Sequence, residues 1–296
     1  MKTTKRRYLG LGAWMLLIVL FCAAGARAAT IAADQFIIDA APDGYTAGNL
    51  YNKGPNTTGM SSATKWQNAT SRWQVDATGL DFAASGGEAG GSAWWIGVDE
   101  TRSVYRELDS PLAVSGGQEY WMAVMVQASG TLDTSGLVLG GFGNTDDPTD
   151  IVGGGGGDDP QGYWVGVKGD GSELDLVLHH RAGEDNMATD VLLDGITLDE
   201  TYLVIIKSIV NGGGGSAEAL SVWVNPTDVS SEAALGTAVS GLSTDQSLFG
   251  TAFTQLSFYG DSLEMVVRFD ELSLGTALSD VVTTVTPPAG TIMIFR

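Results

Sequence analysis

The sequence predicts an all-β fold in which two antiparallel sheets of about 13 strands in total form a sandwich. Polar and apolar residues alternate with a period of two over many short runs, which is the pattern of half-buried strands. The chain has 41 glycines among 296 residues, and each glycine inside a helix costs about 1 kcal/mol relative to alanine. No longer stretch shows an apolar stripe at helical spacing. These observations favour strands and turns.

The expected strands follow one another along the whole chain, each bounded by Gly, Asp or Ser. Glycine runs at 153–157 and 212–215 join neighbouring runs and are typical of hairpin loops. Short helical turns are expected near 231–235 and 276–281. The strands are expected at 33–39, 73–76 with 79–82, 93–98, 103–108, 119–128, 137–142, 162–168, 173–181, 190–198, 201–210, 218–225, 252–260 and 264–274.

Residues 1–28 have the pattern of a signal peptide. A basic stretch that ends at Arg7 precedes an apolar run over 9–24, and Ala26 and Ala28 are the small residues of a cleavage site. The run is shorter than the roughly 20 residues that span a bilayer. We therefore expect secretion with cleavage after Ala28, a single sandwich domain over 29–284, and a C-terminal tail over 285–296.

The charge balance excludes a nucleic-acid binder. The 35 Asp and Glu outnumber the 15 Lys and Arg, whereas a phosphate backbone needs clustered cations. The predicted leader holds five of the basic residues and none of the acidic ones, so the remaining 268 residues carry a formal charge of −25. They also contain no cysteine, since Cys22 lies in the leader, so no disulfide can stabilise the domain. Excess carboxylates make Ca²⁺ the natural candidate for a bound metal.

Two segments near the C-terminus resemble a known family. The run from Leu220 to Pro226 (LSVWVNP) and the run from Phe269 to Thr276 (FDELSLGT) are similar to paired strands of the concanavalin A-like lectin/glucanase superfamily. The resemblance is to its LamG-like members among secreted bacterial proteins. It implies a jelly-roll sandwich and leaves the activity open, since one fold hosts many functions.

Proteins of this kind often end in a PEP-CTERM sorting tail. Here only residues 289–296 follow Pro288, which is too short for a membrane span. We therefore expect a released, monomeric protein without a transmembrane anchor in the mature chain. The favoured function is a non-catalytic module that binds a polysaccharide or glycan, or forms part of an extracellular matrix.

A glycoside hydrolase or lyase of the laminarinase-like type and a purely structural protein are the alternatives. Hydrolysis with retention needs two carboxyl groups about 5–5.5 Å apart. The superfamily signature Glu-x-Asp-x-x-Glu has its nearest match at Glu173 and Asp175, but Leu178 stands where the last acid would be. The sequence therefore assigns no catalytic residue and favours a protein that is not an enzyme.

Two groups of acids are candidate calcium ligands. An acidic loop on either side of the glycine run offers flexible carboxylates, although its spacing differs from an EF-hand. The family resemblance implies a second site that joins Asp270 of the closing strand to Asp34 or Asp39 near the first strand. The loop acids are Asp146, Asp147, Asp150, Asp158 and Asp159.

The histidines, His179 and His180, are adjacent and should point to opposite faces of a strand, one inward and one to solvent, so they do not form one metal site.

Sugar-binding proteins stack sugars on exposed aromatic rings, and Trp94 and Trp95 must face opposite sides of their strand. The candidate saccharide-binding residues are Trp66, Trp94, Trp95, Trp121, Tyr163 and Trp164.

Overall fold

The computed structural model describes residues 30–36, 45–53, 58–61, 65–68, 70–83, 91–113, 117–144, 162–181, 187–209, 219–240, 242 and 252–282. The predicted leader, the tail, both glycine runs and the acidic loop over 146–159 lie outside the described residues.

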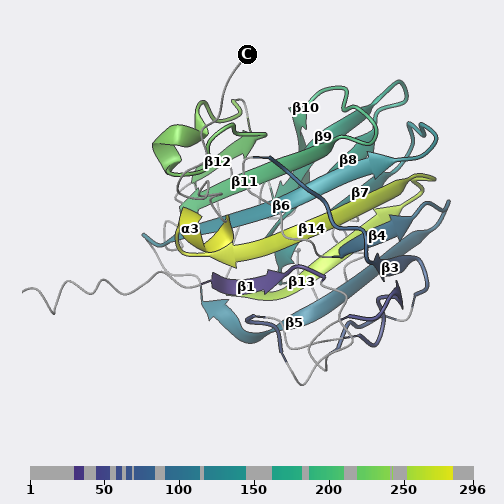
Figure 1. Ribbon diagram of the computed structural model, residues 1–296, viewed down its shortest axis with the longest axis horizontal. Coiled ribbons are helices and arrows are strands. Elements are labelled where there is room, and N and C mark those ends of the chain that lie inside the picture. Colours follow the sequence, from purple (N-terminus) through teal and green to yellow (C-terminus); the bar gives the residue numbers. More distant parts are fainter. Residues whose placement is uncertain are drawn as a thin grey trace, which may run out of the picture.

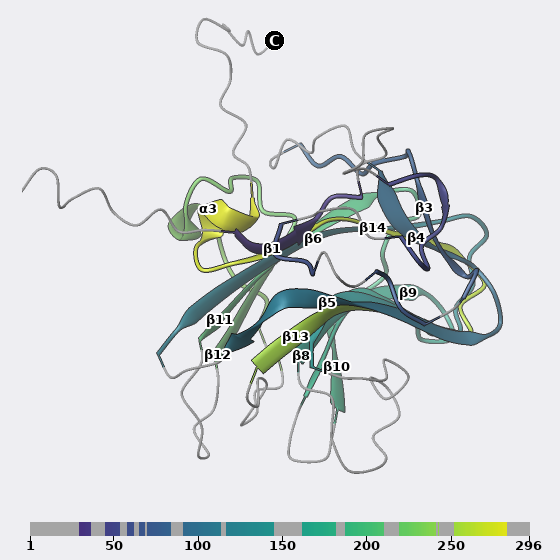
Figure 2. The same ribbon diagram turned by 90° about the horizontal axis from the view of Figure 1, so that it is seen from below.

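The strands form two antiparallel sheets that lie one above the other (Figures 1 and 2). The larger sheet has the order β12-β11-β6-β14-β4-β3-β2, and β1 pairs with β14; the smaller sheet has the order β10-β9-β8-β7-β13-β5. The two-sheet jelly-roll prediction is thus confirmed. The bounds are β1 Thr30–Asp34, β2 Gly48–Asn49, β3 Trp73–Asp76, β4 Ser92–Ile96, β5 Thr101–Ala113, β6 Glu119–Ser129, β7 Leu137–Gly143, β8 Gly162–Gly169, β9 Leu174–Arg181, β10 Met187–Leu193, β11 Thr201–Ile209, β12 Ala219–Val224, β13 Ala252–Asp261 and β14 Val266–Gly275.

The predicted runs overlap these strands, but several bounds differ. The run expected at 190–198 lies at Met187–Leu193 as β10, and the run expected at 103–108 extends over Thr101–Ala113 as β5. The first strand begins at Thr30 and ends at Asp34, because Phe36 takes a positive φ of 50° that turns the chain away. The run 79–82 is no strand, since the Leu80 N–H donates to the Asp270 carboxylate instead of to a neighbouring strand. The two-residue strand β2 was not predicted. Both expected helical turns are confirmed, as η1 (Glu232–Leu235) and α3 (Leu278–Val281).

Aromatic rings fill the space between the two sheets. Phe258 stacks on Trp73 at 4.9 Å and on Trp66 at 5.3 Å between ring centroids. Two glycines make room for these rings: a Cβ on Gly140 would lie 2.6 Å from Phe258, and a Cβ on Gly260 would lie 2.6 Å from Trp95. Close packing of this kind is sensitive to single added methyl groups.

A second apolar cluster lies on the outer face of the larger sheet. Trp121 of β6 and Trp223 of β12 stack there at 5.9 Å, and Leu235 of η1 and Leu278 of α3 cover them. The Lys207 ammonium lies 5.3 Å from the centre of the Trp121 ring. The two helical turns therefore serve to bury this face. No helix in the described ranges is long and apolar enough to cross a membrane.

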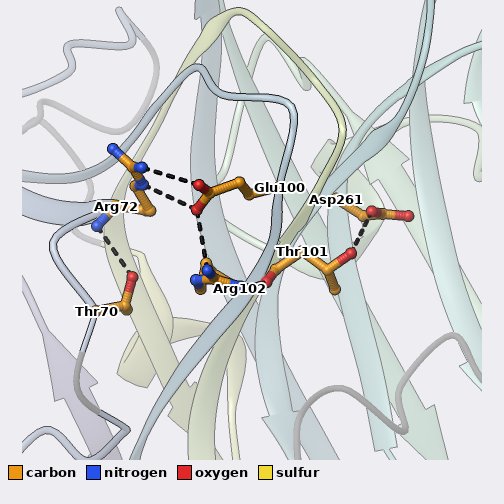
Figure 3. A network of polar contacts seen from close by, with 6 residues as sticks. All are labelled: Thr70, Arg72, Glu100, Thr101, Arg102 and Asp261. Carbon is orange, nitrogen blue, oxygen red and sulfur yellow. Dashed lines mark hydrogen bonds and ion pairs between the residues drawn. The ribbon is translucent and has the colours of Figure 1, made fainter.

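One charged network links the larger sheet to the smaller one (Figure 3). Arg72, next to β3, donates from Nε and Nη2 to the two carboxylate oxygens of Glu100 at 3.1 and 3.0 Å. Arg102 of β5 approaches the same carboxylate at 3.1 Å. A bidentate Arg–carboxylate pair has a fixed geometry, so it holds the turn before β5 against the start of β3.

A buried ion pair joins the sheets in their interior. Asp34 of β1 and Arg106 of β5 are fully buried, with 3.8 Å between Oδ2 and Nη1. The Tyr45 hydroxyl donates to the same oxygen at 2.5 Å, and the Trp66 indole donates to the Tyr45 oxygen at 2.9 Å. Burying two charges is costly, so each member of this network depends on the others.

Replacing Arg106 by Met leaves the Asp34 carboxylate buried without its counter-ion. We expect the free energy of unfolding at pH 7 to fall by about 3–5 kcal/mol, measured by urea denaturation. The matched control is Arg102→Met, whose side chain is 49% exposed and whose loss should cost less than about 1 kcal/mol.

The double variant Arg106→Met with Asp34→Leu separates the pair from general packing. Since it removes both charges, its loss of stability should be smaller than the sum of the losses of the two single variants. If the losses of stability of the two single variants add up to the loss of the double variant, Asp34 and Arg106 do not interact as an ion pair.

Candidate functional site

A row of residues crosses the outer face of the smaller sheet, one from each of its six strands. Each residue is the direct partner of the next in the strand pairing. The strand pairing places Tyr105 opposite Ser257, Trp164 opposite His179, and His179 opposite Thr189. Gly141 lies between Ser257 and Trp164 in this register. We call this the outer row. Its members, in strand order from β5 to β10, are Tyr105, Ser257, Gly141, Trp164, His179 and Thr189.

Hydrogen bonds lock the middle of the outer row. The Trp164 indole passes over Gly141, where a Cβ would lie 3.0 Å from the ring, and donates to the Ser257 hydroxyl at 2.9 Å. Nδ1 of His179 lies 2.8 Å from the Thr189 hydroxyl oxygen. Trp164, Ser257 and His179 are all buried, although they face away from the core between the sheets. This part of the outer face is therefore closed.

The outer face opens at the β5 end, where a pocket of about 520 Å³ lies beside the outer row. This volume falls in the range of about 300–1,000 Å³ that is typical of ligand pockets. Tyr105 and Glu107 reach it from β5, Asn144 follows β7, and Gln255 belongs to β13. The full lining consists of Tyr105, Glu107, Leu108, Pro111, Asn144, Ala252, Thr254 and Gln255.

Strand alternation explains why polar groups line this pocket. On β5, Val104 and Leu108 join the core and Arg106 meets Asp34, so Tyr105 and Glu107 point outward. On β13, Leu256 and Phe258 join the core, so Gln255 also points outward, directly opposite Glu107 in the strand register. The pocket thus brings a carboxylate next to an amide.

Gln255 is the unusual member of the lining. It is 2% exposed, and its Nε2 has no hydrogen-bond partner in the described part of the chain. A buried donor without a partner costs about 1–3 kcal/mol. Such groups are rare in folded proteins, and a bound water, ion or ligand is one way in which they are satisfied. The sequence pattern did not distinguish Gln255, because a single amide within a strand is common.

The structure buries five of the six predicted saccharide-binding residues, either between the sheets or under elements that cover an outer face. Trp94 alone of the six is partly exposed; it lies on the outer face of the larger sheet, and the Arg268 guanidinium carbon is 5.5 Å from its ring centre. A stacking platform needs an open ring face; the aromatic residue that lines the pocket at β5 is Tyr105, which is half-buried. The buried residues are Trp66, Trp95, Trp121, Tyr163 and Trp164.

The two histidines point to opposite faces of β9, as expected. His180 faces inward, where its Nε2 lies 2.9 Å from Oδ2 of Asp190. His179 faces outward but is only 3% exposed, so the expectation that it is solvated is wrong. The cause is the pair of residues on either side of it in the outer row, Trp164 and Thr189, which cover its ring.

Three carboxylates gather beside the β9–β10 hairpin. Oxygens of Glu173, Asp175 and Asp194 lie within 4.8 Å of one another. The Gly195 N–H donates to Asp175 at 3.1 Å, and the nearby Asp194 carboxylate raises the pKa of Glu173 above its ordinary value. Asp194 therefore adds a third acid to Glu173 and Asp175, although it does not take the place of Leu178, which is buried in the core. The sequence did not indicate Asp194, because this contact depends on the turn after β10.

Two of the predicted calcium ligands are described, and both are buried. The Asp34 oxygens accept hydrogen bonds from Tyr45 O–H and Phe36 N–H, and Arg106 neutralises the charge. Asp34 thus has its cation already and fits a calcium site poorly. Asp270 accepts from the N–H groups of Leu80 and Glu271 at 2.8 Å each and has no Lys or Arg partner in the described ranges. Asp39, Asp146, Asp147, Asp150, Asp158 and Asp159 lie outside the described residues.

The buried acids make stability depend on pH. Burial raises the pKa of Asp34 to about 6 and that of Asp270 to about 8, against the opposing effect of the hydrogen bonds they accept. Both carboxyls therefore bind a proton more tightly in the folded chain than in the unfolded chain. Their stabilising effect is complete below about pH 4 and is lost as the pH rises through 6 and 8.

We expect the free energy of unfolding to fall between pH 4 and 8. The measurement contains a chelator, so that no metal ion competes with protons for the carboxylates. Asp270→Asn should flatten the decline between pH 6 and 8, where this carboxyl alone contributes a slope of about 1.4 kcal/mol per pH unit. Asp81→Asn, at an exposed acid, is the control. An unchanged slope in Asp270→Asn would contradict the raised pKa.

No family model matches the chain, and no curated protein matches it either. Solved structures similar to it include an endo-β-1,4-glucuronan lyase from the fungus Trichoderma reesei, at 12% identity over 80% of this chain and 97% of that one, with a TM-score of 0.41. The alginate lyase Aly36B is 14% identical over 77% and 94%, with a TM-score of 0.42. The globular domain of T. cruzi calreticulin is 11% identical over 71% and 86%, with a TM-score of 0.44. These similarities carry no conclusion about activity or ligand.

Proposed function

We propose that this chain is a carbohydrate-binding β-sandwich that holds a saccharide in the pocket between β5 and β13. The observation that carries the proposal is the unsatisfied Gln255 amide in a pocket of about 520 Å³. A ligand with hydroxyl groups offers an acceptor to that donor and recovers the cost of leaving it unpaired.

The other lining groups support a saccharide over an apolar ligand. Glu107 accepts hydrogen bonds, Asn144 and Thr254 both donate and accept, and Tyr105 offers an aromatic ring with a hydroxyl tip. Neighbouring hydroxyl groups on a sugar ring need this mixture of donors and acceptors. A pocket for a purely apolar ligand would be lined mostly by aliphatic and aromatic groups.

The lining supports binding more than hydrolysis. Glu107 is the only carboxylate among the described lining residues, whereas glycoside hydrolysis uses a pair of carboxyl groups flanking one bond. The carboxylates at Glu173, Asp175 and Asp194 belong to the β9–β10 side of the sheet and do not line the pocket. A hydrolase at that cluster stays the alternative.

Titration calorimetry with a panel of tetrasaccharides tests the proposal. We expect at least one to bind, and expect Gln255→Leu and Tyr105→Ala each to weaken binding about tenfold or more, since each removes a group that contacts the ligand. Gln74→Leu is the matched control, because Gln74 is an amide on β3 outside the pocket.

The outcomes of this experiment are distinct. No binding by any tetrasaccharide, or binding that the Tyr105 and Gln255 variants leave unchanged, would overturn the proposal. A separate assay of reducing ends tests the alternative. Release of reducing ends that is lost in Glu173→Gln or Asp194→Asn would establish the hydrolase.

We also propose that Ca²⁺ stabilises the domain through Asp270. Ionising a buried carboxyl without a counter-ion is costly, which is why the pKa of Asp270 is raised to about 8. A hard cation with oxygen ligands offsets that cost and favours the ionised form. The support is the burial of Asp270 and its lack of a cationic partner in the described part of the chain.

The thermal midpoint of unfolding should rise with added calcium and fall with chelator, because a ligand that binds only the folded state stabilises it. The rise should be absent in Asp270→Asn and retained in Asp81→Asn. A rise in the midpoint that persists in Asp270→Asn would show that calcium binds elsewhere. A midpoint of the original protein that calcium leaves unchanged would contradict the proposal.

A further inference from the structure

The pocket between β5 and β13 has a one-sided charge. Glu107 is the only charged residue among its described lining residues, so the described part of the lining has no Lys or Arg. The alternation of β5 is the cause, because it turns Arg106 inward to Asp34 and leaves Glu107 on the outer face. The whole chain adds to this field with a formal charge of −20.

The pairing of β5 with β13 sets a donor beside an acceptor. Glu107 and Gln255 are direct partners in the strand register, so their Cβ atoms are about 4.5–5.5 Å apart. Two neighbouring hydroxyl groups of one sugar ring match this pair, one accepting from the Gln255 amide and the other donating to the Glu107 carboxylate. An ammonium group in place of the second hydroxyl strengthens the contact with Glu107.

A carboxylate on the sugar ring fits the same pair badly. It could accept from Gln255, but it would bring a second negative charge within a few ångströms of Glu107, with no cation in the described lining to neutralise either. Charges at an interface contribute more to specificity than to affinity, because a like-charge contact strongly disfavours one partner. Here the disfavoured partner is the sugar that carries a carboxylate.

We propose that the pocket selects neutral sugars and amino sugars and rejects uronates. This inference rests on the saccharide-binding function proposed above. Glu107 is the residue that decides the selection, and Gln255 is the residue that holds either class of sugar.

Calorimetry at low ionic strength with three tetrasaccharides of equal length tests the selection: cellotetraose, chitosan tetraose and tetragalacturonate. We expect the uronate to bind about tenfold or more weakly than the better of the other two, because one repulsion near a surface is sufficient for that factor. Added salt should narrow the difference, since it screens the Glu107 charge.

Glu107→Gln assigns the cause. It should strengthen uronate binding about tenfold and weaken the binding of chitosan tetraose, because the repulsion of a carboxylate and the attraction of an ammonium group are both lost. Asp81→Asn removes the same charge at an exposed site outside the pocket and should leave all three affinities unchanged.

The result separates the two proposals. Failure of every tetrasaccharide to bind would overturn the saccharide-binding function itself. Binding that depends on Gln255 but is as tight for the uronate as for the neutral sugar would overturn only the selection. A Glu107→Gln variant with unchanged preference would show that another group sets it.

Discussion

The buried pair of Asp34 and Arg106 is the interaction on which the arrangement of the two sheets depends. One member lies on β1 of the larger sheet and the other on β5 of the smaller sheet, and both are fully buried. Tyr45 and Trp66 complete the hydrogen bonding around the carboxylate. A nonspecific apolar core would tolerate sliding of one sheet over the other. Buried charges tolerate it far less, because a displaced pair leaves each charge uncompensated.

The same constraint shapes the surface. Because Arg106 must point inward, Tyr105 and Glu107 must point outward on β5. The register of β5 with β13 then brings Gln255 opposite Glu107. The polar pocket and the buried ion pair are therefore two consequences of one alternating strand, and a shift of one residue in that strand would exchange them.

Much of the fold could be predicted from local pattern. Period-two alternation located nearly all of the strands that the structure describes, and both helical turns were expected. The run 79–82 failed because a backbone N–H at Leu80 found a side-chain acceptor, Asp270, that is far away in the sequence. The candidate site was predicted less well. Trp121 is buried by η1 and α3, and Trp164 by its contact with Ser257, and alternation alone reveals neither contact.

The sequence by itself determined the class of fold and the absence of cysteine after Cys22, because composition and periodicity do not depend on which strands pair. Only the tertiary structure decided which outward side chains are open. Gly141 leaves room for the Trp164 ring, which closes the middle of the outer face, while Tyr105, Glu107 and Gln255 line an open pocket at the β5 end. Exposure depends on the neighbours that strand register brings together, and register joins residues that the sequence keeps far apart.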